Sequence, residues 1–164
     1  QVAELLISAN CHQEVYRTFG CRVVGDDSEM QFRGPLAGML AAMEVAETPY
    51  LLTAPCDSPL LPPNYAQRMW VALEQQGALV SVAFGERCWQ PVFALLPITL
   101  RDDLRQWIAE GQGGVGRWLQ RHQPAQVEFT DWPAMFLNVN TPEELARLEA
   151  ELTIRGCLKT LVTI

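Results

Sequence analysis

An aspartate stands alone in the stretch LLTAPCDSPLLPP, which covers residues 51 to 63. Asp57 follows a short apolar run that is typical of a buried strand, and a proline-rich segment comes after it. In an open parallel α/β sheet, ligands bind outside the carboxyl ends of the strands. A carboxylate at such a strand end can hold Mg²⁺, which is commonly bound by one or two carboxylates together with substrate phosphates. Aspartate is also frequent in turns and caps, so this pattern alone favours a metal ligand and a turn residue about equally.

Two further stretches carry residues that suit the same chemistry. FRGPLAGML places Gly34 and Gly38 around the start of a helix, where free backbone N–H groups and the positive end of the helix dipole attract anions. The alternative for these glycines is close packing of the helix, which small residues also permit. FLNVNTPEELARLE places Asn138 and Asn140 at a predicted strand end, directly before another helix. Beside a lone carboxylate, these stretches indicate a nucleotide site.

Short apolar segments alternate with amphipathic ones along the chain, and this alternation predicts the elements that position these residues. The predicted strands are 4–8, 22–24, 50–53, 78–84, 91–96 and 126–130. The predicted helices are 12–19, 35–47, 64–76, 99–110, 116–122 and 142–151. Because parallel neighbours need crossover connections, the alternation predicts a three-layer α/β/α fold with a mostly parallel sheet and helices on both faces.

The last predicted helix has the clearest start signal. Thr141 is a candidate N-cap, Pro142 takes the first helical position, and Glu144 completes a capping box three residues after Thr141. These residues fix the start of the helix to within about one residue.

Composition and charge limit the classes of protein that fit. The chain has 164 residues, 49% of them hydrophobic, which is about one domain with a real core. We expect a single domain over residues 1–152 and a short tail at 153–164. Nineteen acidic and twelve basic side chains give a formal charge of -7, and no Lys/Arg cluster occurs. This argues against nucleic acid or an anionic membrane as a partner.

Cysteine use and hydropathy indicate the compartment. The five cysteines include no CxxC pair, so neither a disulfide framework nor a zinc site is predicted. No apolar stretch approaches the roughly twenty residues of a membrane span. We therefore expect a cytoplasmic protein.

Motifs of other chemistries are missing or misplaced. GxSxG and HExxH do not occur, and His12 and His122 stand alone, so we interpret them as surface or capping residues. GQGGVG at 111–116 matches GxGxxG, but it follows a predicted helix where the dinucleotide fingerprint requires a strand. We expect a loop between two helices there.

The stretches GPLAGM, LLTAPCDSP and LNVNTPEELARLE, in this order, resemble the molybdenum cofactor guanylyltransferases, which join GMP from GTP to molybdopterin. ISANCHQEVY and WQPVFALL fit the same family, so the resemblance runs from about residue 4 to about residue 151. It implies a Rossmann-like nucleotidyltransferase fold, a magnesium-dependent reaction and release of pyrophosphate. The family's glycine-rich loop, LAGGxxxRMGxxK, does not occur in these 164 residues, which align from the family's second strand onward.

The resemblance also assigns candidate site residues. It makes Asp57 the magnesium ligand and the catalytic residue, with Asn138 and Asn140 on the pterin side of the cleft. The GTP side comprises Ser8, Asn10, Asp26, Gly34, Gly38 and Asp57. Ser8 stands where the family commonly has an asparagine, and Asn10 is a partial replacement for it.

The resemblance implies GTP and molybdopterin as partners, with other proteins of cofactor synthesis or molybdoenzyme chaperones as further ones. Gly113 and Gly114 stand where the family often has arginines that serve the pterin, and Arg117 or Arg121 is a candidate substitute. Two alternatives stay open: a sister nucleotidyltransferase that uses CTP or a sugar-phosphate acceptor, and a non-catalytic relative that binds pterin or a partner protein.

Overall fold

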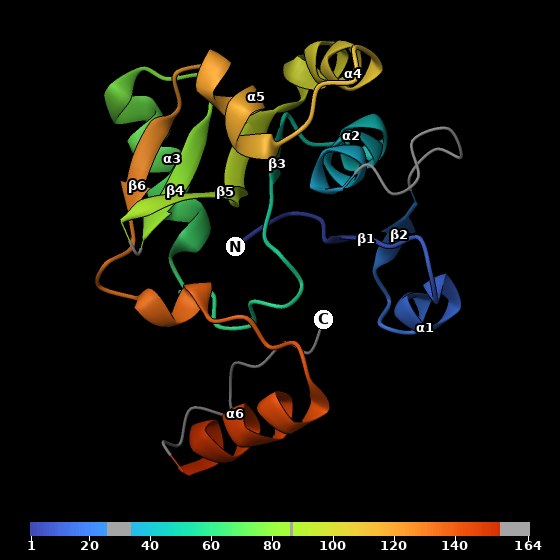
Figure 1. Ribbon diagram of the computed structural model, residues 1–164, viewed down its shortest axis with the longest axis vertical. Coiled ribbons are helices and arrows are strands. Elements are labelled where there is room, and N and C mark those ends of the chain that lie inside the picture. The colour runs from blue at the N-terminus through green and yellow to red at the C-terminus, as the bar shows by residue number, and fades with distance from the viewer. Residues whose placement is uncertain (26–33, 86, 155–164) are drawn as a thin grey trace.

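The computed structural model describes residues 1–25, 34–85 and 87–154 (Figure 1). The strands are β1 (Leu6–Ser8), β2 (Arg22–Val24), β3 (Tyr50–Leu52), β4 (Ser81–Gly85), β5 (Cys88–Pro97) and β6 (Ala125–Glu128). The α-helices are α1 (Gln13–Arg17), α2 (Pro35–Val45), α3 (Tyr65–Gln76), α4 (Arg101–Ala109), α5 (Val115–Arg121) and α6 (Pro142–Ile154). Two short 3₁₀ helices are η1 (Ile98–Leu100) and η2 (Pro133–Phe136). Every strand and helix predicted by its residue range is present, and α6 runs three residues beyond its predicted end. The strand end expected at Asn138 and Asn140 is wrong, because η2 and an irregular segment precede α6 there.

The strands form two groups. β3, β5, β4 and β6 make a four-stranded sheet in that order, and β1 and β2 make a separate parallel pair. β5 is antiparallel to both β3 and β4, whereas β4 and β6 are parallel. The prediction of a mostly parallel sheet is therefore wrong for β5. The reason is that residues 86–87 alone connect β4 to β5, which is far too short for the crossover that parallel neighbours need.

A bulge interrupts the ladder between β4 and β5. Val82 pairs with Ala94, but the next residue, Ala83, pairs with Gln90, so residues 91–93 of β5 have no partners in this register. This interruption accommodates Pro91, which has no N–H to donate to a ladder. A bulge bends its strand and changes the direction of its backbone groups. In this bulge the carbonyl of Val92 accepts a hydrogen bond from Thr53, the residue after β3.

Helices cover both faces of the four-stranded sheet. Along β5, Phe93 and Leu95 join a buried cluster with α3, while Ala94 and Leu96 join another with α2, α4 and α5. This alternation follows from the period of two along a strand. In Figure 1 the latter three helices lie near one another, and α3 lies beside β4. The predicted α/β/α arrangement with three layers is confirmed.

Helices α2 and α6, whose sequence signals are both clear, differ in how deeply they are buried. The apolar residues predicted on α2 from helical spacing all enter the core: Leu36, Met39, Leu40 and Met43. α6 is exposed along most of its length, Leu148 is buried, and the helix stands apart from the sheet in Figure 1.

GQGGVG lies between α4 and α5, as predicted. Among the described residues, no helix combines the length and apolar character needed to cross a membrane.

Candidate functional site

The strand that precedes Asp57 is anchored at its end by Thr53. The backbone N–H of Thr53 donates to the carbonyl of Ala94 at 2.8 Å, and its hydroxyl donates to the carbonyl of Val92 in the bulge at 2.6 Å. The hydroxyl of Tyr65, at the start of α3, donates to the carbonyl of Thr53 at 2.8 Å. Burial raises the pKa of Tyr65 well above its ordinary value, so this donor stays protonated. The chain therefore leaves the sheet in a fixed direction toward Asp57.

The loop with Asp57 is joined directly to the segment that carries the asparagines. The backbone N–H of Val139 donates to the carbonyl of Asp57 at 2.7 Å. The hydroxyl of Ser58 donates to Oδ1 of Asn138 at 3.0 Å, and Ser58 is buried with 2% exposure. The structure thus brings together two of the three stretches that the sequence singles out.

Asp57 is half-buried, and its carboxylate makes no hydrogen bond or ion pair with any other residue that the structure describes. Among the described residues, no group of three or more His, Cys, Asp and Glu side chains is arranged to hold a metal ion. A single unpaired carboxylate fits Mg²⁺, which takes one or two protein carboxylates and fills its other positions with water and substrate phosphates. It does not fit zinc, which takes several nitrogen or sulfur ligands.

The second asparagine is positioned by the capping box of α6. A carboxylate oxygen of Glu144 accepts hydrogen bonds from the backbone N–H of Asn140 at 2.8 Å and of Thr141 at 3.1 Å. In return, the N–H of Glu144 donates to the hydroxyl of Thr141 at 3.2 Å. The predicted capping box is confirmed, and Asn140 is exposed directly after Val139, which binds the loop of Asp57.

The ends of β1 and β2 lie at one edge because the two strands are parallel and Ser8 is in register with Val24. Just beyond them, the side chain of Gln13 donates to the carbonyl of Ala9 at 2.8 Å. A Cβ on Gly25 would lie 2.7 Å from the amide nitrogen of Gln13, so the end of this flexible side chain would have to move if Gly25 were replaced. Asn10 is exposed beside this contact. Asp26, a predicted GTP-site residue, lies outside the described residues.

Gly34 begins α2 in a backbone conformation that favours glycine. Its φ is 73° and its ψ is -162°, a region that residues with a Cβ rarely enter. A Cβ would meet nothing within 4 Å, so the requirement comes from the backbone rather than from space. No described side chain caps this helix end, and Gly38 lies half-buried one turn further along. The backbone N–H groups at the start of this helix suit an anion.

The candidate arginines both lie on α5, and Arg121 contacts α4. The guanidinium of Arg121 lies over the ring of Trp107, 5.0 Å from its centroid, and 3.7 Å from a carboxylate oxygen of Asp103. His122 is the C-cap of α5, as one of its two interpretations expects, and it contacts the same carboxylate at 3.1 Å. Arg121 is therefore engaged within the helix pair, while Arg117 is exposed.

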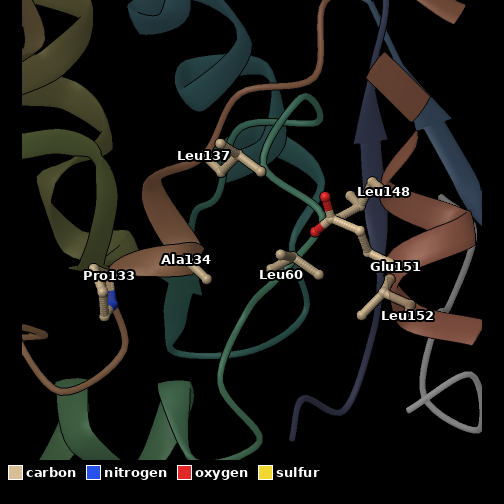
Figure 2. Close-up of a pocket in the computed structure, with 7 residues that line it drawn as sticks. All are labelled: Leu60, Pro133, Ala134, Leu137, Leu148, Glu151 and Leu152. Atoms are coloured by element: carbon tan, nitrogen blue, oxygen red, sulfur yellow. The ribbon is translucent and has the colours of Figure 1, made fainter. Parts of the chain in front are cut away.

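Figure 2 shows a pocket of about 230 Å³ between η2 and α6, next to the asparagine segment. Its lining is apolar except for Glu151 and consists of Leu60, Pro133, Ala134, Leu137, Leu148, Glu151 and Leu152. Leu137 directly precedes Asn138, so the pocket adjoins the site without containing Asp57.

Sequence reasoning missed three residues that shape this site: Thr53, Ser58 and Tyr65. Each acts through a contact with a distant part of the chain, which a local pattern does not reveal. The one available signal was the polar Thr53 at the end of an apolar strand.

The fold is that of the nucleotidyltransferases. A solved structure from Archaeoglobus fulgidus, molybdopterin-guanine dinucleotide biosynthesis protein A, aligns with a TM-score of 0.67 at 18% identity, over 91% of this chain and 78% of that one. The 2-C-methyl-D-erythritol 4-phosphate cytidylyltransferase of Thermus thermophilus aligns with a TM-score of 0.66 at 14% identity, over 93% of this chain and 84% of that one. At these identities the likeness concerns the fold alone.

A family model and a relative of higher sequence identity define the family of this chain. Residues 1–127 match the model of the MobA-like NTP transferase domain. The molybdenum cofactor guanylyltransferase of Shewanella baltica (strain OS155 / ATCC BAA-1091) is 42% identical over 153 residues, which are 93% of this chain and 78% of the relative. The chain belongs to the MobA-like NTP transferase family, and the resemblance stated from the sequence is confirmed.

Proposed function

We propose that this chain transfers GMP from GTP to molybdopterin, forms molybdopterin guanine dinucleotide and releases pyrophosphate, with Mg²⁺ as its metal. Membership of the family and the 42% identity to a molybdenum cofactor guanylyltransferase support the reaction. The observation that carries the assignment of the site concerns Asp57, whose carboxylate pairs with no other described residue. Asp57 lies in the loop that follows β3, and its backbone carbonyl accepts a hydrogen bond from the asparagine segment. A metal ion held by Asp57 would thus lie beside the candidate acceptor-binding residues.

The reaction requires positioning rather than a covalent nucleophile. An oxygen of the molybdopterin phosphate attacks the α-phosphorus of GTP in line with the bond to the β-phosphate, which breaks as pyrophosphate leaves. Mg²⁺, when bound, neutralises charge on the phosphates. Asp57 would hold the metal, and the start of α2 at Gly34 would bind phosphate oxygens through its backbone N–H groups. Asn138 and Asn140 would contact the acceptor.

We place this activity in the cytoplasm. The four described cysteines are all free, which suits a reducing compartment. Cys11, Cys56 and Cys88 are exposed, and Cys21 is half-buried. GTP and molybdopterin are the proposed partners, and other proteins of cofactor synthesis are further candidates.

Calorimetric titration with GTP in the presence of Mg²⁺ tests the site. We expect Asp57→Ala to weaken magnesium-dependent GTP binding by at least about tenfold, since one charge-assisted metal contact is lost. Glu74→Ala, which removes an exposed carboxylate on α3, serves as the matched control and should bind GTP like the parent chain. CTP should bind more weakly than GTP. Equal GTP affinity of the two variants would contradict the assignment of Asp57, and a preference for CTP would favour the sister cytidylyltransferase chemistry.

A further inference from the structure

Ser58 is an unusual residue in this loop because its hydroxyl is buried. It is one of two buried polar residues among those the structure describes, and the other is Ser81. Ser81 donates to the backbone carbonyl of Met69 within the core at 3.0 Å. Ser58 instead donates to a side chain, Oδ1 of Asn138, which is exposed and eighty residues further along the chain.

This hydrogen bond determines what Asn138 presents to a ligand. An asparagine amide accepts through its oxygen and donates through its nitrogen. Because Oδ1 of Asn138 accepts the hydroxyl of Ser58, the amide nitrogen is directed elsewhere. No other described residue accepts a hydrogen bond from this nitrogen. Asn138 therefore offers a donor to solvent or to a ligand.

The donor is also fixed relative to the proposed metal ligand. Ser58 follows Asp57 directly, and the N–H of Val139, the residue after Asn138, donates to the carbonyl of Asp57. Two adjacent residues of one loop thus bind two adjacent residues of the other. A rigid two-point junction of this kind holds an amide donor beside a carboxylate that suits a metal.

We propose that Ser58 is a positioning residue that holds Asn138 as a hydrogen-bond donor toward the oxygen-rich, anionic acceptor substrate. The inference rests on the proposed function, because it assumes that the acceptor lies on the Asn138 side. Without the hydroxyl, the amide of Asn138 can rotate and present its oxygen, which repels an anion. The loop itself keeps its other anchors, the Val139–Asp57 hydrogen bond and those of Thr53.

Steady-state kinetics of Ser58→Ala, with molybdopterin and GTP varied in turn, test this role. We expect the KM for molybdopterin to rise roughly tenfold, with the KM for GTP unchanged, since one oriented hydrogen bond is lost. Ser81→Ala is the matched control, because it removes the other buried serine hydroxyl. It should lower the midpoint of thermal unfolding and leave both KM values unchanged.

A double-mutant cycle separates positioning from stability. If Ser58 acts through Asn138, Ser58→Ala should add little to the loss in Asn138→Ala. Asn138→Asp should also raise the KM for molybdopterin, because aspartate still accepts from Ser58 but offers no donor.

Each unfavourable result has a distinct meaning. Additive effects of Ser58→Ala and Asn138→Ala, or a Ser58→Ala chain that loses thermal stability with an unchanged KM for molybdopterin, would overturn the role of Ser58 alone. A parent chain that binds GTP but transfers nothing to molybdopterin would overturn this role together with the proposed function.

Discussion

The ring of Phe136 occupies the space that a Cβ on Gly85 would need. Gly85 ends β4, and Phe136 ends η2, two residues before Asn138. The end of a central strand is therefore in contact with the segment that delivers the asparagines. Phe136 also meets Phe93 of β5 edge to face, with ring centroids 5.5 Å apart, so its position is determined from two sides.

Gly85→Ala should displace Phe136 and destabilise the fold by about 1 to 3 kcal/mol, the usual cost of forcing extra atoms into a packed site. Urea unfolding measures this loss. Because η2 leads into the asparagine segment, we also expect the KM for molybdopterin to rise.

Replacing Phe136 by alanine tests whether the methyl group added at position 85 clashes with its ring. In Gly85→Ala/Phe136→Ala the added methyl has room, so the double variant should be more stable than the sum of the two single losses predicts. Strictly additive losses would show that the ring of Phe136 moves away from Gly85 without cost.

Tyr65 should make stability depend on pH in the alkaline range. Burial raises the pKa of Tyr65 well above its ordinary value of 10.0 in the folded chain. Below pH 10 the phenol is protonated in both states, and its hydrogen bond to Thr53 contributes fully. As the pH rises above 10, the unfolded chain ionises first, so the free energy of unfolding falls, by at most about 1.4 kcal/mol per pH unit.

Tyr65→Phe isolates this contribution. At about pH 8 we expect a loss of about 1 to 2 kcal/mol, because the carbonyl of Thr53 loses its buried partner. Between about pH 10 and 11 the difference between the variant and the parent chain should shrink. Urea unfolding of the variant and the parent chain, at about pH 8 and at about pH 10 to 11, measures this difference in free energy. A difference that does not change with pH would mean that Tyr65 ionises equally in the folded and unfolded chains.

The capping box of α6 should govern the local opening of that helix. Thr141→Ala removes a cap worth about 1 kcal/mol. Since α6 is largely exposed, we expect amide hydrogen exchange in α6 to accelerate roughly fivefold with little change in global stability. Glu149→Ala, an exposed glutamate outside the box, should exchange like the parent chain. Equal rates in the two variants would contradict the prediction.

Much of the fold follows from local sequence signals. α3 ends where predicted because Gly77 takes the left-handed conformation that stops a helix, with φ 60°. Pro35 begins α2, and the Thr141–Glu144 box begins α6, as predicted. These signals act within a few residues, so one sequence suffices to read them.

The direction of β5 was readable in principle. The predicted strands 78–84 and 91–96 leave six residues between them, too few for a crossover helix. The alternation of element types outweighed that loop length in the prediction. The bulge around Pro91 has no local signal beyond the proline itself, because it depends on the register with β4.

The candidate site was predictable only in part. Asp57 stands out because a polar residue follows an apolar strand, and the structure joins its segment to that of Asn138. The strand end expected before Asn138 is wrong, because the short helix η2 leads into that segment instead. The partner of Ser58 depends on tertiary contacts between segments far apart in the sequence. Ser8 and Gly34 lie at the end of β1 and the start of α2, and their roles toward GTP remain predictions.

The reversed strand also bears on the order of folding. β4 and β5 form a hairpin that closes locally, and among the described strands β3 pairs with β5 alone. Contacts between residues close in sequence form sooner than distant ones. We expect the hairpin to form early and to serve as the template on which β3 docks. The loop that carries Asp57 would then acquire its shape late, after the antiparallel strand beside it is already in place.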